Sequence, residues 1–248
     1  MAKQVVFGLG ALIGEKIVSA GVVTPVEFGI LQEVSLKFDG STKKLQGQSA
    51  FPADVARTGL GISWTAKAAD IRGGLLNDLF FNGTVTTGQV RLIRNELGDA
   101  VTGNQYTVAQ TALFKEDLGV KYKVSKNPLT RVAATPGVGE YSVTVAGVYS
   151  FNTADTDADV GVYITYTYTA ATGKTVKITN PLMGDVPTFA MHLFQPYKLK
   201  EVYWKLNRNI FKSLDWAGKN EDYTIPGLEG EAYADDNDDV GLFAATDY

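Results

Sequence analysis

Alternation of hydrophobic and polar residues with a period of two dominates the chain. In Val26–Asp39, six hydrophobic residues share one face, on which Gln32 is the only polar member. The opposite face is polar apart from Leu31, and Gly29 marks a candidate bend. Because successive side chains of a β-strand point to opposite sides, this pattern predicts one long strand with a single buried face.

The same alternation recurs further along the chain, in Tyr141–Phe151 and Val160–Thr169. Both stretches are rich in β-branched and aromatic residues, which suit a pleated surface. Residues 152–157 connect these two stretches, and residues 170–173 connect the second of them to a further expected strand, Thr175–Thr179. Such short connections predict an antiparallel meander.

Two further strands and one helix are expected. Leu60, Ile62 and Trp64 begin one strand, and Lys198–Ile210 forms the other. The helix is predicted over Ala66–Phe81, where six apolar residues follow a helical stripe. These six are Ala68, Ile71, Leu75, Leu76, Leu79 and Phe80.

The predicted helix has a stop signal and a weak point. Asn82-Gly83 supplies the stop. Gly73-Gly74 weakens the helix by about 1 kcal/mol per glycine relative to alanine, so tertiary packing must hold it.

Together these elements predict a mainly β fold, an antiparallel β-sandwich or barrel with one flanking α-helix. The length of 248 residues is expected to form a single β domain, large enough for a core of its own. A glycine-rich N-terminal arm is expected over about residues 1–25, and a loop-bearing insertion rich in Gly, Asn and Thr over about residues 98–140.

Composition excludes several kinds of chemistry. The chain has no cysteine, which rules out disulfides, thiolate metal sites and cysteine nucleophiles. A net charge of −4 and a pI near 5.1 argue against a protein that grips nucleic-acid phosphates. They are compatible with a protein past which nucleic acid slides without binding.

The N-terminal segment Val5–Gly14 is apolar and follows a lysine, as the core of a signal peptide does. Glu15 and Lys16 interrupt it at once, and it is too short to span a bilayer. The chain is therefore expected to be soluble and made in the cytosol.

The acidic run Asp235–Asp239 is the first candidate for a metal site. Asp235, Asn237 and Asp239 match the first three ligand positions of a helix–loop–helix calcium loop. Position six is Val240 instead of glycine, and position twelve is Thr246 instead of glutamate. The run is therefore interpreted as a polar hairpin loop, for which Asp and Asn are suitable residues.

Two glycine motifs resemble nucleotide-binding loops. Gly8–Gly14 reads G-x-G-x-x-x-G, with Glu27 or Glu33 available for a ribose. However, strands rather than alternating strands and helices follow it, so a dinucleotide domain is not expected. Gly173-Lys174-Thr175 matches the end of a phosphate-binding loop, but Tyr168 stands where its first glycine belongs, so a hairpin turn is the better interpretation.

No residue pattern indicates an enzyme. His192 is the only histidine, and no partner motif for a catalytic triad or a two-histidine metal site accompanies it. The 27 acidic residues allow many carboxylate pairs, but no arrangement selects one pair for glycoside hydrolysis. The sequence therefore predicts no catalytic, cofactor-binding or metal-binding residues and no cofactor.

The order of several segments resembles the major tail tube proteins of long-tailed bacteriophages. The similarity begins in the first long strand and the helix and ends in an aromatic strand followed by an acidic turn. The segments that carry it are Phe28–Leu36, Lys43–Gly47, Asp70–Phe81, Gly147–Phe151, Val162–Tyr168, Lys219–Pro226 and Glu231–Asp235.

This resemblance implies a structural virion protein located in the phage tail. Its β-sandwich subunits would form hexameric rings that stack into a tube, through which DNA passes during ejection without specific binding. The implied partners are further copies of itself and other tail proteins, such as the tape measure, the tail terminator and, in some tails, a sheath. Lys37, Lys43 and Lys44 lie on or near the first strand, so the sequence does not assign the face that lines the lumen.

Two alternatives belong to other functional classes. The first is another virion or surface binding module of the decoration or adhesin type, with aromatic contacts from Tyr163, Tyr166, Tyr168 and Trp204. The second is an enzyme, either a carboxylate-dependent hydrolase or a cofactor user built on the N-terminal glycines.

Overall fold

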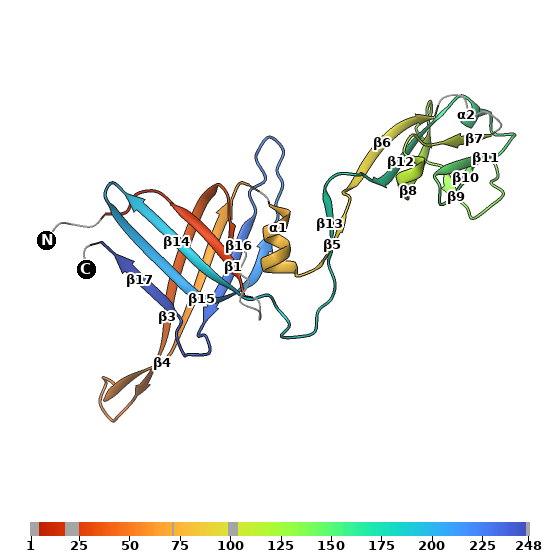
Figure 1. Ribbon diagram of the computed structural model, residues 1–248. Coiled ribbons are helices and arrows are strands. Elements are labelled where there is room, and N and C mark those ends of the chain that lie inside the picture. Colours follow the sequence, from red (N-terminus) through yellow and green to blue (C-terminus); the bar gives the residue numbers. More distant parts are fainter. Residues whose placement is uncertain (1–4, 18–24, 71, 99–103, 247–248) are drawn as a thin grey trace. The chain divides into compact units, whose positions relative to one another are not determined.

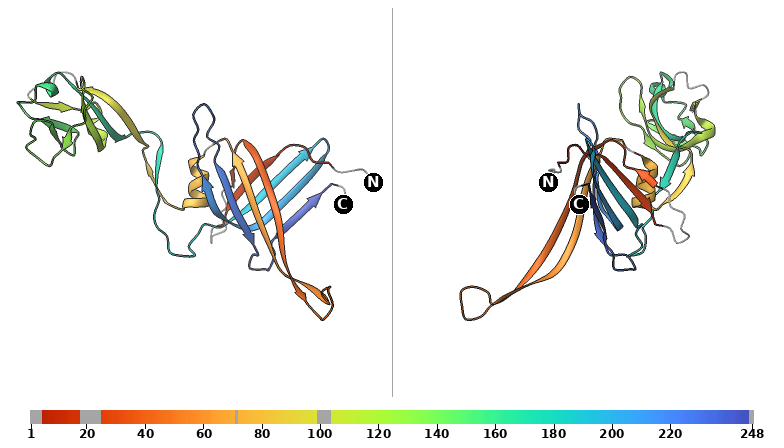
Figure 2. Two further views of the ribbon diagram at one scale, coloured as in Figure 1. Left: turned by 180° about the vertical axis from the view of Figure 1, so that it is seen from behind. Right: turned by 60° about the vertical axis from the view of Figure 1, so that its left-hand side comes forward.

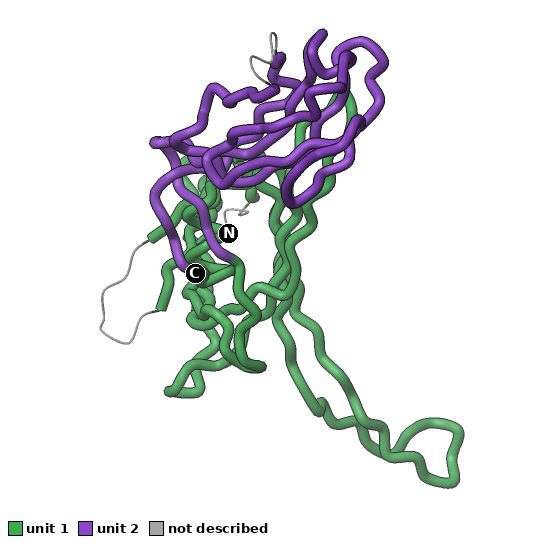
Figure 3. Tube along the Cα trace, turned by 90° about the vertical axis from the view of Figure 1, so that its right-hand side faces the viewer, with its two compact units in different colours: residues 1–83, 178–248 green, residues 84–177 purple. Residues whose placement is uncertain are grey.

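The computed structural model describes residues 5–17, 25–70, 72–98 and 104–246. The chain divides into two units, and Figure 3 colours them separately. Unit 1 comprises residues 1–83 and 178–248, and unit 2 comprises residues 84–177. The separate part is thus larger than the expected insertion at about residues 98–140, because the strands on both sides of that stretch fold together with it.

Unit 1 is built on one eight-stranded sheet with the strand order β2-β1-β14-β15-β16-β4-β3 and with β17 beside β15 (Figure 1). All of its strand pairs are antiparallel. Its strands are β1 Ala11–Lys16, β2 Pro25–Glu27, β3 Leu31–Leu45, β4 Asp54–Ala68, β14 Phe189–Tyr197, β15 Lys200–Asp215, β16 Gly227–Tyr233 and β17 Gly241–Ala245.

The expected glycine-rich arm contributes a strand to this sheet. β1 lies between β2 and β14, and its Leu12 is buried in the core. Gly10 has a φ of +68°, and a Cβ at this position would lie 1.7 Å from the carbonyl oxygen of Phe194. The glycine thus permits the close approach of β1 to β14. Residues 1–4 and 18–24 of the expected arm lie outside the described residues.

The predicted strand Val26–Asp39 is divided in two. β2 ends at Glu27, and β3 begins at Leu31 after Gly29, whose φ is +76°. The candidate bend is therefore a break between two strands. The expected buried face is confirmed in part: Phe28 is buried and Val26, Val34 and Leu36 pack against the core, whereas Ile30 and Phe38 are exposed. Leu31 of the opposite face is buried instead.

The helix is shorter than predicted. It consists of α1 Gly73–Leu76, continued by the single π-helical turn η1 Asn77–Phe81. Ala66 and Ala68 belong to β4, because pairing with β3 overrides the helical pattern there. Ile71 lies outside the described residues.

The predicted stop is confirmed. Asn82 is left-handed with a φ of +46°, and the Asn77 side chain accepts a hydrogen bond from the Gly83 N–H.

An aromatic cluster forms the centre of the unit 1 core. Trp64 lies edge-on to Phe211 and Phe189, with ring centroids 5.1 and 5.9 Å apart. A Cβ on Gly230 of the neighbouring strand would lie 2.3 Å from the Trp64 ring, so only glycine fits there. Leu75 and Leu79 of the helix pack into the same core, which explains how a helix weakened by two glycines persists.

Unit 2 consists of a small sandwich of two sheets and of a two-stranded sheet, β5 with β13, at the two ends of its chain segment. One sheet of the sandwich has the strand order β6-β12-β8 and the other β7-β11-β10-β9. Their facing side chains, such as Ile164 and Tyr149, share one core. The strands are β5 Thr84–Thr87, β6 Val90–Gly98, β7 Gln105–Thr107, β8 Phe114–Tyr122, β9 Thr130–Arg131, β10 Glu140–Val143, β11 Val148–Phe151, β12 Val162–Thr169 and β13 Lys174–Lys177; the short helices are η2 Thr111–Leu113 and α2 Thr156–Asp159.

The expected meander is not formed. Tyr141–Phe151 is a hairpin, β10 and β11, that turns at Gly147 with a φ of +71°. β11 and β12 belong to different sheets, and β13 pairs with β5 instead of β12. The alternation of residues is equally compatible with one strand or with two strands joined by a tight turn, so it did not reveal the turn.

The predicted fold class is confirmed: the protein is mainly β, with antiparallel sheets and one short flanking helix. The only parallel pair among the described strands joins β9 to β10. The described strands form no closed barrel.

Replacing Leu79 by alanine should destabilise unit 1 by about 2–5 kcal/mol, because its fully buried side chain fixes the helix to the sheet. Chemical denaturation followed by tryptophan fluorescence measures this, since all three tryptophans lie in unit 1. Leu182→Ala, at a residue that is 83% exposed, is the matched control and should change stability by less than about 0.5 kcal/mol. Equal effects of the two variants would contradict the described packing.

Residues 84–177 expressed alone should fold, because the unit has its own core and its own sheets. Thermal unfolding followed by circular dichroism should show one cooperative transition with a β-type spectrum. A spectrum typical of an unfolded chain would show that the unit depends on the rest of the protein.

Candidate functional site

A long two-stranded ribbon is the most exposed feature of unit 1. β3 and β4 pair from Leu31 with Ala68 to Leu45 with Asp54. β16 pairs with β4 only over residues 62–67, so β3 is the only described strand that pairs with residues 54–61. Figures 1 and 2 show the outer half of the ribbon extending away from the sheet. Every residue from Lys37 to Gly61 is exposed except Pro52, which is half-buried.

The ribbon tip, defined as residues 43–57, combines apolar and cationic side chains. Phe51 in the connecting loop is 84% exposed, and Leu45 and Val55 flank it on the two strands. Lys43, Lys44 and Arg57 form no ion pair with any residue in the described part of the chain. Asp54 is the only acidic residue of the tip.

The acidic run lies in an interruption of a strand. β16 pairs with Arg208–Asp215 of β15, and β17 continues along β15 over Val202–Leu206. Residues 234–240 bulge out between these two strands as the acidic loop. The predicted flanking strands are present, but they pair with β15 rather than with each other, so the predicted hairpin is wrong.

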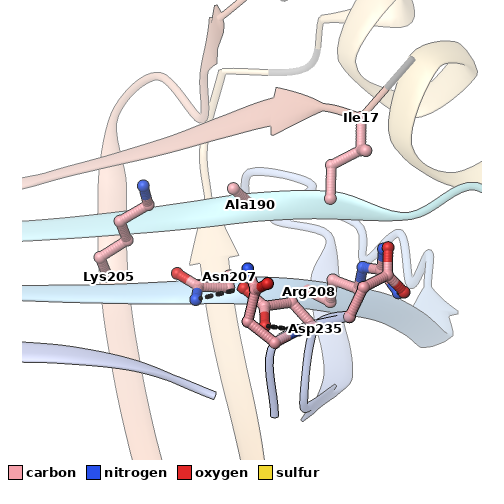
Figure 4. Close-up of a pocket in the computed structure, with 8 residues that line it drawn as sticks. Ile17, Ala190, Lys205, Asn207, Arg208 and Asp235 are labelled. Atoms are coloured by element: carbon pink, nitrogen blue, oxygen red, sulfur yellow. Dashed lines mark hydrogen bonds and ion pairs between the residues drawn. The ribbon is translucent and has the colours of Figure 1, made fainter. Parts of the chain in front are cut away.

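Hydrogen bonds to β15 hold the acidic loop, as the close-up in Figure 4 shows. The Asn207 amide donates to Asp235 Oδ2 at 2.9 Å. Arg208 binds both carboxylate oxygens of Asp236. The backbone N–H groups of Asn237 and Asp239 donate to Asp235 and lower the pKa of its carboxyl group.

Not every carboxylate of the acidic loop forms an ion pair with the described residues. Asp235 acts as the internal acceptor of the loop, whereas the carboxylates of Asp238 and Asp239 have no ion-pair partner among the described residues. The described residues also contain no group of three acidic or histidine side chains placed to hold a metal ion.

An apolar groove begins where the acidic loop ends. It is a hollow of about 220 Å³ between the base of the ribbon and the strands β15 and β17. Trp204 lies at its centre, with ring centroids 5.4 Å from Phe38 and 4.4 Å from Phe243. The groove is lined by Phe38, Ile62, Trp204, Lys205, Leu206, Val240, Gly241, Leu242 and Phe243.

Unit 2 contains three carboxylates that accept hydrogen bonds from tyrosine hydroxyls. Asp117, whose side chain is 3% exposed, accepts from Tyr141 at 2.7 Å and from Tyr149 at 2.8 Å. Burial, and then these hydrogen bonds, raise the pKa of both tyrosines, so they remain protonated donors.

The other two carboxylates are held in the same way. Glu96 accepts from the Tyr166 hydroxyl at 2.6 Å, and Asp155 accepts from the Tyr122 hydroxyl at 2.8 Å. Burial and the bond to Asp155 raise the pKa of Tyr122 to about 12. All three carboxylates are thus satisfied by internal donors, which is typical of structural residues rather than of a catalytic pair.

The nucleotide motifs prove to be structural elements. Gly14 lies in β1, where a Cβ would be 2.6 Å from the Leu79 side chain, so the residues that follow Gly10 form a strand instead of the start of a helix. Gly173 has a φ of +83° in a bend next to β13, but the predicted hairpin is wrong, because β13 pairs with β5 instead of β12. Neither segment forms a phosphate-binding loop at the start of a helix.

The remaining candidates are dispersed. The His192 ring lies 2.6 Å from the Tyr203 hydroxyl and 3.3 Å from a Glu15 oxygen, within the unit 1 sheet. Of the aromatic residues considered for partner binding, Tyr166 is fully buried in unit 2 and Trp204 belongs to unit 1. Lys126 covers the Tyr163 ring at 4.3 Å. The sequence alone did not reveal the groove, because its walls come from four strands.

No helix in the described part of the chain is long and apolar enough to cross a membrane.

Replacing Asp155 by asparagine should lower the stability of unit 2 by about 1–2 kcal/mol at pH 7. Burial opposes ionisation of this carboxyl group, but donors from Gly139, Tyr122 and Ala158 outweigh it and lower its pKa below 3.8. Its stabilising effect is therefore fully present above pH 3.8 and disappears as the pH falls through the lower folded-state pKa. Urea denaturation of wild type and variant should thus give curves that converge in acid. A difference that stays constant down to the lowest pH would contradict this.

No protein-family model and no curated protein sequence matches this chain.

Proposed function

We propose that this protein is a structural subunit of a virus particle, a tail tube protein that assembles with copies of itself into rings, which stack into a DNA-conducting tube. The single observation that carries this proposal is the β3–β4 ribbon. An extended ribbon with an exposed apolar tip leaves apolar surface in water when the protein is alone. A subunit that assembles can bury this surface against a neighbour.

The energetics of the ribbon support an assembled state. A two-stranded ribbon in water is marginally stable, because too little apolar surface is buried to offset its ordering. Over residues 54–61 of β4, no described strand other than β3 pairs with the ribbon. Contact with further subunits would supply the missing burial.

The sheet edges are also suited to assembly. β3 is an edge strand of 15 residues, and β2 is the opposite edge strand of the same sheet. Edge strands with free backbone groups pair readily with other chains. Pairing around an axis closes a ring, and head-to-tail contact along the axis extends it. The net charge of −4 fits a lumen that does not retain DNA phosphates.

Unit 2 favours a second candidate function, that of a binding module. It is a sandwich with its own core, and the two-stranded sheet of β5 and β13 carries its chain connections to unit 1. Loops and edges of such a separate unit are free to contact a partner, as in a decoration or adhesin protein. This candidate predicts a stable monomer or small oligomer that binds one stoichiometric ligand.

Negative-stain electron microscopy of the purified, concentrated protein tests the first proposal. Stacked rings or hollow tubes should appear, and sedimentation should show mass rising with concentration. Deleting the ribbon tip, for example by joining residues 42 and 58 through a two-residue turn, should abolish these polymers while the sheet remains folded. Monodisperse monomers of the intact chain at high concentration, in both low and moderate salt, would contradict the proposal and favour a binding module.

A further inference from the structure

We propose that the apolar groove beside the acidic loop is the docking site for the ribbon tip of a second copy of this chain. This inference rests on the proposed function, because it assumes that copies associate, and it specifies which two surfaces meet. Phe51 of one copy would enter the groove around Trp204 of the next. Lys44 and Arg57, which lie on the same face of the ribbon because Arg57 pairs with Thr42, would face Asp238 and Asp239.

The groove has the properties of a receiving site. Its apolar wall is incompletely covered in the single chain, since Phe38, Leu242 and Phe243 are between 44% and 52% exposed. Trp204 behind them packs against the unit 1 core, so the floor of the groove is held rigidly. A preformed apolar hollow with a large aromatic side chain at its centre is typical of the anchor points of protein interfaces.

The tip has the matching properties of an inserted element. Phe51 is the most exposed phenylalanine among the described residues, at 84%, and lies in the loop at the end of the ribbon. The cationic residues of the tip stand next to this anchor, and the acidic loop stands next to the groove. Both surfaces thus have charged residues beside an apolar centre, and the tip cations and the acidic loop have opposite signs, although the groove itself is also lined by Lys205.

The unpaired state of these charges within one chain supports the match. Lys43, Lys44 and Arg57 on the tip lack an ion-pair partner among the described residues, as do Asp238 and Asp239 on the loop. Most other charges on the ribbon and the nearby strands are paired within the chain, as Lys37 is with Asp39 and Lys212 with Glu231. Lys205 and Asp215 of β15 also form no ion pair among the described residues, but the cations of the tip and the carboxylates of the loop are the unpaired charges that stand next to the two apolar surfaces.

The tip cannot fill the groove of its own chain. Phe38 at the base of the ribbon forms one wall of the groove, and seven residues of extended strand, about 23 Å, separate it from Leu45 at the end of β3. Figure 2 shows the ribbon extending away from the β16–β17 region. The contact must therefore be intermolecular. Because tip and groove are different surfaces of one chain, it is head-to-tail and can propagate.

Site-specific cross-linking tests the contact directly. The chain has no cysteine, so Lys44→Cys with Asp238→Cys in one chain introduces the only two thiols. A short thiol-specific cross-linker should convert this double variant into a ladder of multimers on a denaturing gel. Each single variant should give no more than a dimer band. The matched control joins Lys44→Cys with Lys174→Cys, an exposed residue of unit 2, and should give no ladder.

Charge exchange tests the pairing independently. K44E/R57E and D238K/D239K should each raise the protein concentration needed for assembly by about tenfold in low salt. The variant carrying all four substitutions should restore assembly to near the wild-type concentration. The control K174E/K177E makes the same charge change on exposed residues elsewhere and should have little effect. Circular dichroism confirms that each variant is folded.

The anchor is tested by Phe51→Ala, which should raise the assembly concentration by at least about tenfold. Leu199→Ala, at an apolar residue that is 97% exposed in the turn before β15, is the control and should leave it unchanged.

The outcomes separate this inference from the proposed function. Polymers without a cross-linked ladder, or four substitutions that fail to restore assembly, would overturn the groove contact and leave the tube proposal standing. A ladder without rings or tubes in micrographs would support the contact and count against the tube. If the intact chain neither associates nor cross-links at high concentration, both are overturned.

Discussion

The backbone pairing of β15 is the constraint on which the rest of unit 1 depends. This strand binds β14 along one edge and both β16 and β17 along the other, so it connects every part of the sheet. Its Asn209 is fully buried and donates to the carbonyl oxygens of Phe189 and Leu206, next to the register shift between β14 and β15. An irregular strand pair inside a core needs such internal hydrogen bonds.

The acidic loop is a consequence of this pairing. Two collinear strands share one edge of β15, and the residues between them have to leave the sheet at Asn207. Polar side chains are needed there, because the bulged backbone faces water and its N–H groups require acceptors. Asp235 supplies that acceptor, which leaves its acidic neighbours available at the surface. The same interruption lets the apolar groove open beside them.

The two units are stabilised by different interactions. Unit 1 depends on a large aromatic cluster between its sheet and the helix. Unit 2 is small and adds tyrosine–carboxylate hydrogen bonds to its core, with Asp117 linking β8 to the hairpin of β10 and β11. Such buried bonds specify one pairing of the sheets, since any other leaves a carboxylate without donors. The ribbon has neither kind of support, and this contrast motivates the proposed assembly.

The sequence by itself determined the mainly β class, most of β15, which is predicted as residues 198–210 and observed as Lys200–Asp215, the presence of a strand through Leu60, although β4 begins earlier, at Asp54, and the end of the helix at Asn82. These features depend on local patterns, such as alternation, turn residues and motif spacing, which act within about ten residues. Only the tertiary structure decided that Tyr141–Phe151 turns back on itself, that Ala66 joins a strand and that the region around residues 98–140 belongs to a separate sandwich. It also decided the groove, whose walls come from β3, β4, β15 and β17. The physical reason is that strand pairing is non-local: a period of two specifies which side chains share a face, but not which strand lies beside it.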